Sequence, residues 1–294
     1  MTAGRAHVGA TVVITGAASG IGLRTAAQLT AAGFRTVAVA RSQERAHAVV
    51  AGATASARHG GSIVVVPADL ADLAQVRAAA ARIRDMGPIA ALINNAAVFD
   101  LSRTQARITV DGIEETFAVN HVAPFVLTHE LGPALAGDAV VVTAASKGLI
   151  ALPRLRLDPH DFDSRNDYRP TRAYYLSKIA QLLFTAELAR RGTGAVALRI
   201  PSVRVDDDKL RGYPARLRAP YRVKSLFAAD PSAIAAQYLG LAAGPPAATA
   251  RYVDERGRDV RWTNQTADPR LAALVWDRTA ALAGVTRPDH PHPT

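Results

Sequence analysis

The sequence predicts an α/β protein built on one doubly wound parallel sheet, with helices on both faces of the sheet. Two observations predict this class. Short segments that are apolar on both faces of a strand recur along the chain, and helical patterns separate them. The 294 residues read as a single domain, since sheets of this kind often exceed the usual domain size. We assign the domain to residues 1–286 and expect residues 287–294, rich in Pro and His, to form a flexible tail without a bound metal.

The elements are expected in a regular order. The first strand is placed at Thr11–Thr15, where β-branched residues dominate. A glycine-rich turn and an Ala- and Leu-rich helix follow, and Gly33 is placed at the C-cap of that helix. The remaining strands are expected at Thr36–Ala40, Ser62–Pro67, Ala90–Ile93, Val140–Thr143 and Ala195–Ile200.

Two segments interrupt this alternation. Residues 149–172 form an insertion rich in Pro, Arg and Asp, and residues 203–230 are polar and basic with interspersed aromatic residues. Both follow strands and therefore lie at the carboxyl edge of the sheet, where open α/β sheets bind ligands. A solvated loop is the simpler interpretation of residues 203–230, and a substrate lid is the functional one that we adopt.

The composition argues against several classes of protein. The chain has no cysteine, which excludes disulfides and thiolate metal sites, and nothing in it indicates secretion. The short polar stretch before the first strand leaves no room for a signal peptide, and no apolar run approaches the ~20 residues of a membrane span. We therefore expect a cytoplasmic protein.

The net charge of +10 does not indicate a nucleic-acid partner. The Arg residues are scattered, and no DNA- or RNA-binding motif is present. Only four of the 35 basic residues are Lys, and Ala is abundant, a composition typical of GC-rich bacterial coding sequences. The expected partner is a small molecule, and the expected state is a monomer or a homodimer.

The stretch from Thr15 to Gly22, TGAASGIG, predicts a dinucleotide phosphate site. Gly16 supplies the tight turn after the strand, and Gly20 and Gly22 let the backbone approach a pyrophosphate and the helix pack on the sheet. The helix N-terminus then presents free N–H groups to the phosphates. A glycine-rich turn without a ligand is the alternative, but its position between a strand and a helix favours a Rossmann fold that binds a dinucleotide. The contacting residues of this loop are taken to be Gly16, Ala18, Ser19, Gly20, Ile21 and Gly22.

Arg41 indicates which dinucleotide is bound. A carboxylate just past the second strand would bind the ribose 2′-hydroxyl and reject a 2′-phosphate. Here the position holds Arg41, with Ser42 beside it and Arg45 nearby. A guanidinium matches a phosphate well, so NADP(H) is the expected cofactor, although a solvated surface Arg is the simpler alternative.

Tyr174 and Lys178 form the candidate catalytic pair. Residues i and i+4 lie on one face of a helix. A free Tyr has a pKa near 10, and a nearby ammonium favours the phenolate. Tyr174 would then exchange a proton with a carbonyl or alcohol oxygen while Lys178 tunes it and binds the nicotinamide ribose. Tyr175 lacks this spacing and is interpreted as a packing or pocket residue.

Taken together, these motifs resemble the short-chain dehydrogenase/reductase superfamily, and within it the branch similar to retinol dehydrogenases and the WW-domain oxidoreductase. The resemblance covers about residues 10–285 and rests on Thr15–Gly22, Ala40-Arg41, Ala68–Leu70, Asn94–Ala96, Phe117–His121, Ala173–Lys178, Leu183–Ala189 and Leu274–Arg278. It implies that Asp69 and Leu70 contact the adenine, and that Asn94 and Ala96 sit beside the adenosine ribose and phosphates. It also implies that Asn120 organises a water relay to the Lys, and that Pro201 and Val203 lie against the cofactor.

The chain departs from the family pattern at the end of the fifth strand. The family has a serine there that hydrogen-bonds the substrate oxygen, followed by two residues and a Gly. Counting back from Gly148 places that role on Ala145, one residue before Ser146. Either the loop shifts and Ser146 acts, which we favour, or Thr143 or a water replaces the serine.

Two further departures follow. The usual Pro-Gly reads Pro201-Ser202, and the expected Thr after it is replaced by Val205-Asp206. Asn-Asn-Ala-Gly reads Asn94–Ala97, a mild change. The resemblance therefore implies an NADP(H)-dependent carbonyl reductase or alcohol dehydrogenase for a lipophilic or aromatic ketone or alcohol, with ketoreduction in bacterial natural-product biosynthesis as a setting. The departures keep two alternatives open, a non-redox cyclase or dehydratase on the same fold and a cofactor-binding regulator.

Overall fold

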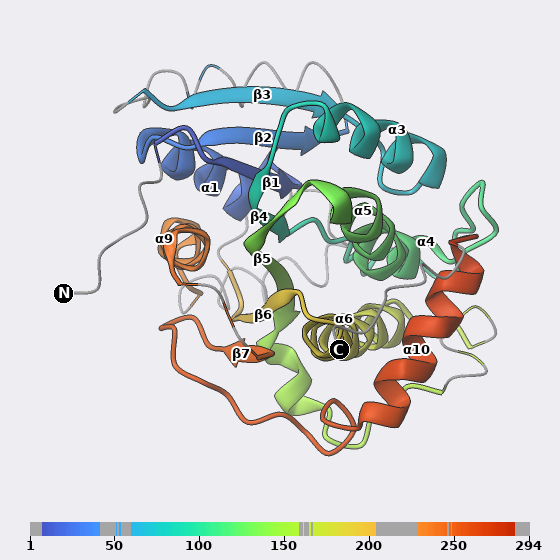
Figure 1. The fold of residues 1–294 in the computed structure, drawn as a ribbon. Coiled ribbons are helices and arrows are strands. Elements are labelled where there is room, and N and C mark those ends of the chain that lie inside the picture. Colours follow the sequence, from blue (N-terminus) through green and yellow to red (C-terminus); the bar gives the residue numbers. More distant parts are fainter. Residues whose placement is uncertain are drawn as a thin grey trace, which may run out of the picture.

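The computed structural model describes residues 8–41, 51, 53, 60–158, 161, 165, 167–203, 228–245, 247 and 249–285. Seven strands form one parallel sheet in the order β3-β2-β1-β4-β5-β6-β7 (Figure 1). The strands are β1 (Thr11–Thr15), β2 (Arg35–Ala40), β3 (Ser62–Pro67), β4 (Ile89–Asn94), β5 (Leu135–Ser146), β6 (Gly194–Ile200) and β7 (Arg251–Val253). The structure confirms the predicted single α/β domain with a doubly wound parallel sheet.

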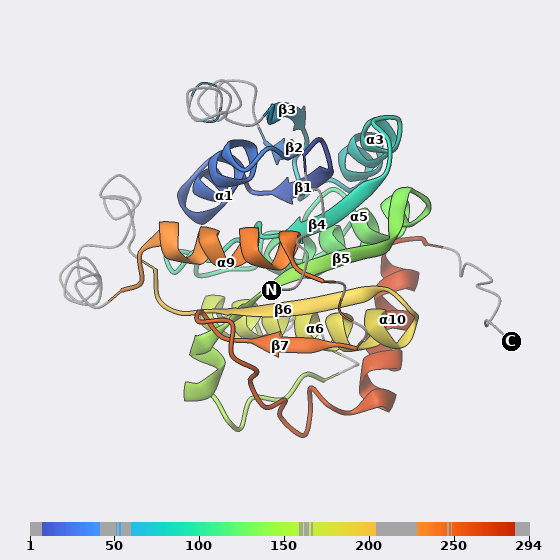
Figure 2. The same cartoon turned by 60° about the vertical axis from the view of Figure 1, so that its left-hand side comes forward.

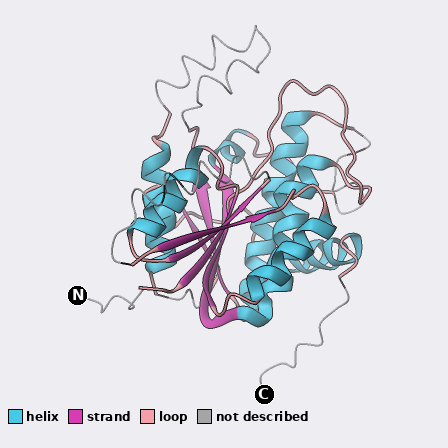
Figure 3. Cartoon of the chain, turned by 90° about the horizontal axis from the view of Figure 1, so that it is seen from above, coloured by secondary structure: helices cyan, strands magenta, loops and turns pink. Residues whose placement is uncertain are grey.

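Helices cover both faces of the sheet (Figures 2 and 3). One face carries α1 (Gly20–Ala31) and α9 (Pro231–Ala243), and the other carries α3 (Leu73–Arg84), α5 (Ala123–Leu131) and α6 (Pro170–Arg190). Shorter helical segments connect these elements: α4 (Glu115–Phe117), the π-helix η1 (Ala118–Val122), and the 3-10 helices η2 (Gly132–Ala134) and η3 (Lys147–Ala151). The strand side chains follow this division, since Val13 joins the α3–α5–α6 core whereas Val12 and Ile14 join the α1–α9 core.

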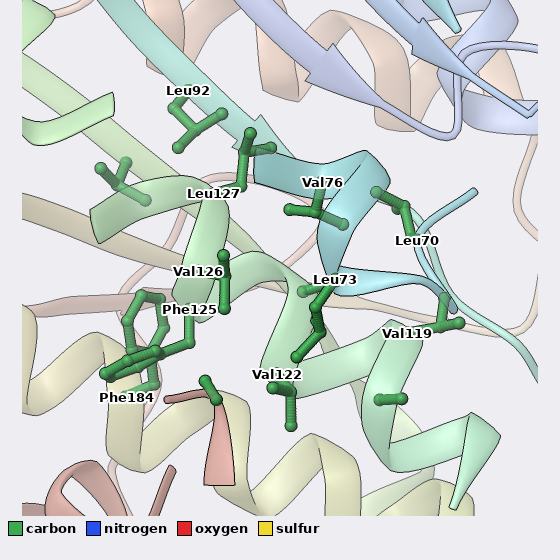
Figure 4. Close-up of a cluster of buried hydrophobic side chains, with 14 of the residues drawn as sticks. Leu70, Leu73, Val76, Leu92, Val119, Val122, Phe125, Val126, Leu127 and Phe184 are labelled. Atoms are coloured by element: carbon green, nitrogen blue, oxygen red, sulfur yellow. The ribbon is translucent and has the colours of Figure 1, made fainter. Parts of the chain in front are cut away.

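The larger core lies between the sheet and the α3–α5–α6 layer (Figure 4). Leu73 and Val76 of α3 lie on the same side of this core as Val122 and Val126, whereas the Phe125 ring points toward Phe184 of α6, and all of these side chains are buried.

The last helix, α10 (Pro269–Leu282), packs outside this layer against α6. Its Trp276 ring stacks on Phe184 with centroids 5.7 Å apart, and the Arg191 guanidinium lies 4.4 Å from the Trp276 centroid. This anchors the C-terminal helix on α6, the helix that carries the candidate catalytic pair.

One strand and several element boundaries differ from those expected from the sequence, and β2, β4, β5 and β6 each begin one to five residues earlier than expected. β7 was missed because three residues give no usable period. β5 extends to Ser146, because backbone pairing of Ala144, Ala145 and Ser146 with β6 overrides the low strand propensity of Ala. α6 begins at Pro170, so the insertion after β5 ends at Arg169.

Candidate active site

The glycine loop after β1 is closely packed. Gly16 has φ 69°, a left-handed conformation that disfavours other residues. A Cβ at Gly16 would lie 2.9 Å from the Cα of Ala96, so Ala96 lies directly against the turn. A Cβ at Gly22 would lie 2.2 Å from the Gly16 carbonyl oxygen, which leaves no room for any side chain there. The loop therefore depends on glycine for its shape.

Thr15 and Asn95, to which the motifs assign no separate role, hold this loop to β4. The Thr15 Oγ1 accepts hydrogen bonds from the main-chain N–H groups of Asn95 and Ala96, both at 3.1 Å. The Asn95 side-chain amide donates to the Thr15 carbonyl at 3.0 Å. Thr15 and Asn95 thus join the ends of two adjacent strands beneath the loop. Both lie inside the motifs, but their pairing is visible only in the fold.

The N-terminus of α1 remains open to a ligand. Ser19 is the N-cap, and its exposed side chain makes no capping hydrogen bond. No acidic residue lies in the first turn, so the partial positive charge of the helix end is not neutralised locally. Ala18 and Ile21 are half-buried on either side of it. This arrangement fits an anionic ligand such as a pyrophosphate.

The other residues expected at the cofactor are spread along the carboxyl edge. Arg41 is exposed directly after β2, whereas Ser42 and Arg45 lie outside the described residues. Asp69 is half-buried, with its Oδ1 accepting from Ala71 N at 3.0 Å, and Leu70 is 9% exposed and packs in the core of Figure 4.

Asn94 is buried at the end of β4. Its side-chain nitrogen donates to Thr128 Oγ1 at 3.2 Å, and its Oδ1 has no hydrogen-bond partner among the described residues. A buried acceptor without a partner is unusual in a native protein. It is compatible with a ligand at this edge of the sheet.

Helix α6 presents Tyr174 and Lys178 together. The Lys178 Nζ lies 5.7 Å from the centroid of the Tyr174 ring, as the i, i+4 spacing requires. Lys178 is 1% exposed, and its Nζ donates to the Ala144 carbonyl of β5 at 2.8 Å. Burial lowers the pKa of Lys178 from 10.5 to about 7, so its charge changes in the neutral range.

Three residues at the end of β5 could take the place of the family serine that hydrogen-bonds the substrate oxygen, and their surroundings differ. Ala145 is 2% exposed and packs with Leu182, Ala197 and Tyr252. Thr143 is fully buried, and its hydroxyl bonds the hydroxyl of Thr185 at 2.6 Å.

Ser146 is the last residue of β5, and its Oγ accepts a hydrogen bond from Gly148 N at 3.2 Å. Because the oxygen accepts there, the hydroxyl proton remains available for a second partner. Ala145 has no hydroxyl, and the Thr143 hydroxyl is already paired with Thr185. Of the three residues, Ser146 is therefore the one best suited to donate a hydrogen bond to a ligand.

Asn120 lies in the π-helix beside α6. Its Oδ1 accepts from Val98 N at 2.7 Å, and its Nδ2 donates to the Val98 carbonyl and to Ser177 Oγ, both at 3.0 Å. Its main-chain carbonyl accepts from the side-chain nitrogen of Gln181. Asn120 therefore links the segment after β4 to α6, and Gln181 enters the site without having been identified from the sequence.

Two aromatic residues line Tyr174. Phe99 stacks on the Tyr174 ring with centroids 4.3 Å apart and an interplanar angle of 26°. Tyr175 is half-buried, and a Cβ at Gly148 would lie 2.1 Å from its hydroxyl oxygen. Tyr175 thus packs against the turn after Ser146, which agrees with its interpretation as a packing residue. Phe99 was missed because a single aromatic residue in a loop carries no sequence pattern.

The segment after β6 is described only at its ends. Val203 pairs with Ala229 in an isolated parallel bridge, and Ala229 N donates to the Ser202 carbonyl at 2.9 Å. The two ends of the expected lid therefore meet beside Pro201 at the carboxyl edge of the sheet. Residues 204–227, with Val205 and Asp206, lie outside the described residues, as does the tail after residue 285.

Comparison with known proteins agrees with this geometry. The family model described as "short chain dehydrogenase" matches residues 10–154. A Streptomyces sp. (strain C5) protein named "Putative daunorubicin C-13 ketoreductase DnrU" is 34% identical over 280 residues, covering 95% of this chain and 94% of the relative. Human retinol dehydrogenase 12 is 30% identical over 285 residues, covering 94% of this chain and 87% of that protein.

Solved structures give the same result. An uncharacterized protein from Mycobacterium paratuberculosis has a TM-score of 0.69 at 28% identity, with 96% of each chain covered. A blue fluorescent protein from a metagenomic library, solved in complex with NADPH, has a TM-score of 0.61 at 25% identity, covering 84% of this chain and 97% of the other.

The chain therefore belongs to the short-chain dehydrogenase/reductase family of oxidoreductases. It falls in the branch that includes the retinol dehydrogenases, as the sequence motifs predicted. Among the described residues, no helix combines the length and the apolar character needed to cross a membrane.

Proposed function

We propose that this protein is an NADP(H)-dependent carbonyl reductase or alcohol dehydrogenase, acting between a lipophilic or aromatic ketone and its secondary alcohol. The observation that carries the proposal is that Tyr174 and Lys178 share one face of α6, and that Lys178 is hydrogen-bonded to β5, the strand whose last residue is Ser146, beside an open glycine loop. A phenol, an ammonium and a hydroxyl in this relation supply a proton and a hydrogen bond to one substrate oxygen.

The residues present fit a bound nicotinamide dinucleotide. The uncapped N-terminus of α1 and the unpaired Oδ1 of Asn94 are polar groups that the described residues leave available at this edge. When bound, the cofactor would supply or accept a hydride. Gly16, Gly20 and Gly22 would hold its pyrophosphate, and Lys178 would bind the ribose beside the nicotinamide.

NADP is proposed over NAD because of Arg41. This exposed guanidinium follows β2, where a 2′-phosphate would lie, and a charge-assisted hydrogen bond to phosphate is worth about 1.5–3 kcal/mol. The NADPH found with the metagenomic relative supports the same choice.

The protein residues move and stabilise charge in the proposed reduction. Ser146 donates its hydroxyl hydrogen to the carbonyl oxygen, which gathers negative charge as the reaction proceeds. Tyr174 gives its phenolic proton to that oxygen, and the nearby Lys178 ammonium stabilises the phenolate that results. In the direction of oxidation the same phenolate accepts the alcohol proton.

The proposed substrate class rests on Phe99 and on the relatives. Phe99 lies half-buried against the Tyr174 ring, so an apolar aromatic surface borders the reacting oxygen. The Streptomyces relative is named for ketoreduction of daunorubicin, an aromatic ketone, and the human relative for retinol, a lipophilic alcohol. Ketoreduction in bacterial natural-product biosynthesis is the proposed setting, with the protein in the cytoplasm as a monomer or homodimer.

The test is a panel of aromatic and aliphatic ketones, followed by the loss of NADPH absorbance. Tyr174→Phe keeps the shape of the ring and removes the proton, so we expect turnover to fall by at least about 100-fold. Tyr175→Phe is the matched control and should retain most activity, because Tyr175 packs against Gly148. Equal losses in the two variants would contradict the assignment, and NADPH binding without turnover of any ketone would favour a non-redox enzyme or a regulator.

A further inference from the structure

Helix α6 carries a buried polar stripe that extends beyond the catalytic pair. Tyr174, Lys178, Gln181 and Thr185 follow one another at intervals of four, three and four residues, so they share one helix face. Lys178 and Gln181 are each 1% exposed and Thr185 is fully buried. Polar side chains this deeply buried need partners, because their desolvation is otherwise costly.

Two members of the stripe have partners on β5. The Thr185 hydroxyl bonds Thr143 of β5 at 2.6 Å and donates to the Gln181 carbonyl at 2.8 Å. The Lys178 Nζ donates to the Ala144 carbonyl at 2.8 Å. An ammonium has three N–H groups, and this carbonyl is the acceptor that the described residues provide for it. Lys178 therefore has donor capacity left.

Gln181 has the complementary property. Its side-chain nitrogen donates to the main-chain carbonyl of Asn120, and a carbonyl only accepts, so the orientation of the amide is determined by its partner. The amide oxygen must then face the other way. That oxygen, Oε1, is buried and has no hydrogen-bond partner among the described residues. A free acceptor thus lies one helical turn from a lysine with free donors.

We propose that Gln181 is a positioning residue, whose amide joins the Asn120 carbonyl to the Lys178 ammonium through one water bound between Oε1 and Nζ. The water satisfies both groups at once, since it donates to the amide oxygen and accepts from the ammonium. The Asn120 side chain takes no part in this link, because its Oδ1 and Nδ2 already bond Val98 and Ser177. Gln181 thereby holds Lys178 in the direction of Tyr174 without touching substrate.

The electrostatic surroundings of Lys178 make this link measurable. The Lys178 Nζ lies 5.7 Å from the centroid of the Tyr174 ring, and Tyr174 interacts electrostatically with Tyr238 of α9, whose pKa is raised mainly by burial, so that Tyr238 stays neutral. His121, next to Asn120, bonds Thr279 at 2.8 Å instead, and burial lowers its pKa to about 3, so it stays neutral. A pH-dependent coupling free energy between Gln181 and Lys178 therefore reports the charge on the Lys178 side chain.

The experiment is a double-mutant cycle on the unliganded protein, so it does not depend on the proposed function. Gln181→Met and Lys178→Met keep the length of each side chain and remove the polar end. The unfolding equilibrium constant is measured in urea for the four variants at pH 6 and pH 10. At pH 6 we expect Gln181→Met to raise this constant about tenfold more in the parent background than in the Lys178→Met background. At pH 10, where Lys178 is neutral, the coupling should fall below twofold.

Additive effects within twofold at pH 6, or a coupling of the same size at both pH values, would overturn the proposal. Thr185→Val is the control, because it removes a polar group of the same stripe that bonds Thr143, and its effect should add to that of Lys178→Met. If Gln181→Met does not fold, Gln181→Asn enters the same cycle, since it keeps the amide and withdraws the oxygen by one methylene.

A kinetic measurement adds the consequence for catalysis and rests on the proposed function. In Gln181→Met, the pH dependence of NADPH-linked turnover should shift to lower pH, with the KM for NADPH within twofold of the original. Loss of turnover without a pH shift would contradict a positioning role. If the parent protein reduced no ketone, the proposed function would be refuted. The double-mutant cycle would then decide by itself whether Gln181 is coupled to Lys178.

Discussion

We expect the charged form of Lys178 to destabilise the folded state of the unliganded protein. It is fully enclosed between α6 and β5, and burial lowers its pKa from 10.5 to about 7. Since each pKa unit is about 1.4 kcal/mol, holding the charged form in the folded state costs roughly 5 kcal/mol. Replacement by Met removes this cost and the hydrogen bond to Ala144, which is worth about 1 kcal/mol. The net expectation is that Lys178→Met stabilises the unliganded protein by up to about 4 kcal/mol at pH 6.

The pH dependence has a defined sign. Below pH 7 the lysine is charged in both the folded and the unfolded state, so the full cost is present. Between about pH 7 and 10.5 the unfolded state binds the proton and the folded state does not, so the parent protein gains stability as the pH rises. The advantage of Lys178→Met should therefore shrink across this window and vanish near pH 10.5.

The assay is urea unfolding of both proteins without cofactor at pH 6, 8 and 10, with the two free energies of unfolding subtracted at each pH. Subtraction removes the titration of all shared groups. Lys147→Met is the matched control, because Lys147 is 44% exposed and pairs with Glu255 at 2.8 Å, so a change below about 1 kcal/mol is expected. A Lys178→Met protein that is less stable than the parent at pH 6, or a difference that does not vary with pH, would refute the reasoning.

Three further predictions concern the glycine loop, Arg41 and the proposed role of Ser146. Gly22→Ala forces a Cβ to 2.2 Å from the Gly16 carbonyl and should abolish NADPH binding measured by fluorescence titration, whereas Gly240→Ala in α9, with open space at its Cβ, should raise stability by about 0.5–1 kcal/mol. Arg41→Asp should shift the preference from NADP toward NAD, and equal affinity of the parent protein for both cofactors would remove the basis of this prediction. Ser146→Ala should lower turnover at least about 100-fold with little change in NADPH affinity, and an unchanged turnover would return the serine role to another group.

Much of the fold was accessible from the sequence because it depends on local patterns. Strands buried on both faces alternate with helical segments, which is enough to predict a parallel sheet covered on both sides. The glycine loop and the Tyr174–Lys178 pair were equally accessible, since each is defined by spacing within a single turn or helix. Gly33 was expected at the C-cap of the first helix, but Ala32 is the C-cap, and Gly33 follows it with φ 95°.

Contacts between distant segments were decided by the tertiary structure alone. Which residue ends β5 depends on pairing with β6, and that pairing buries Ala145 and leaves Ser146 at the strand end. Phe99 reaches Tyr174 because Asn120 binds the backbone of Val98, 22 residues away in the sequence.

The same holds for Gln181. In the sequence it is one polar residue within an apolar helix, and its partner, the Asn120 carbonyl, lies 61 positions away. By itself the sequence determined the sheet, the glycine loop and the spacing of Tyr174 and Lys178 on one helix, because each is encoded by neighbours along the chain. The surroundings of Lys178 were decided by the packing of α6 against β5 and the π-helix, because burial and hydrogen bonding between elements exist only once the elements are assembled.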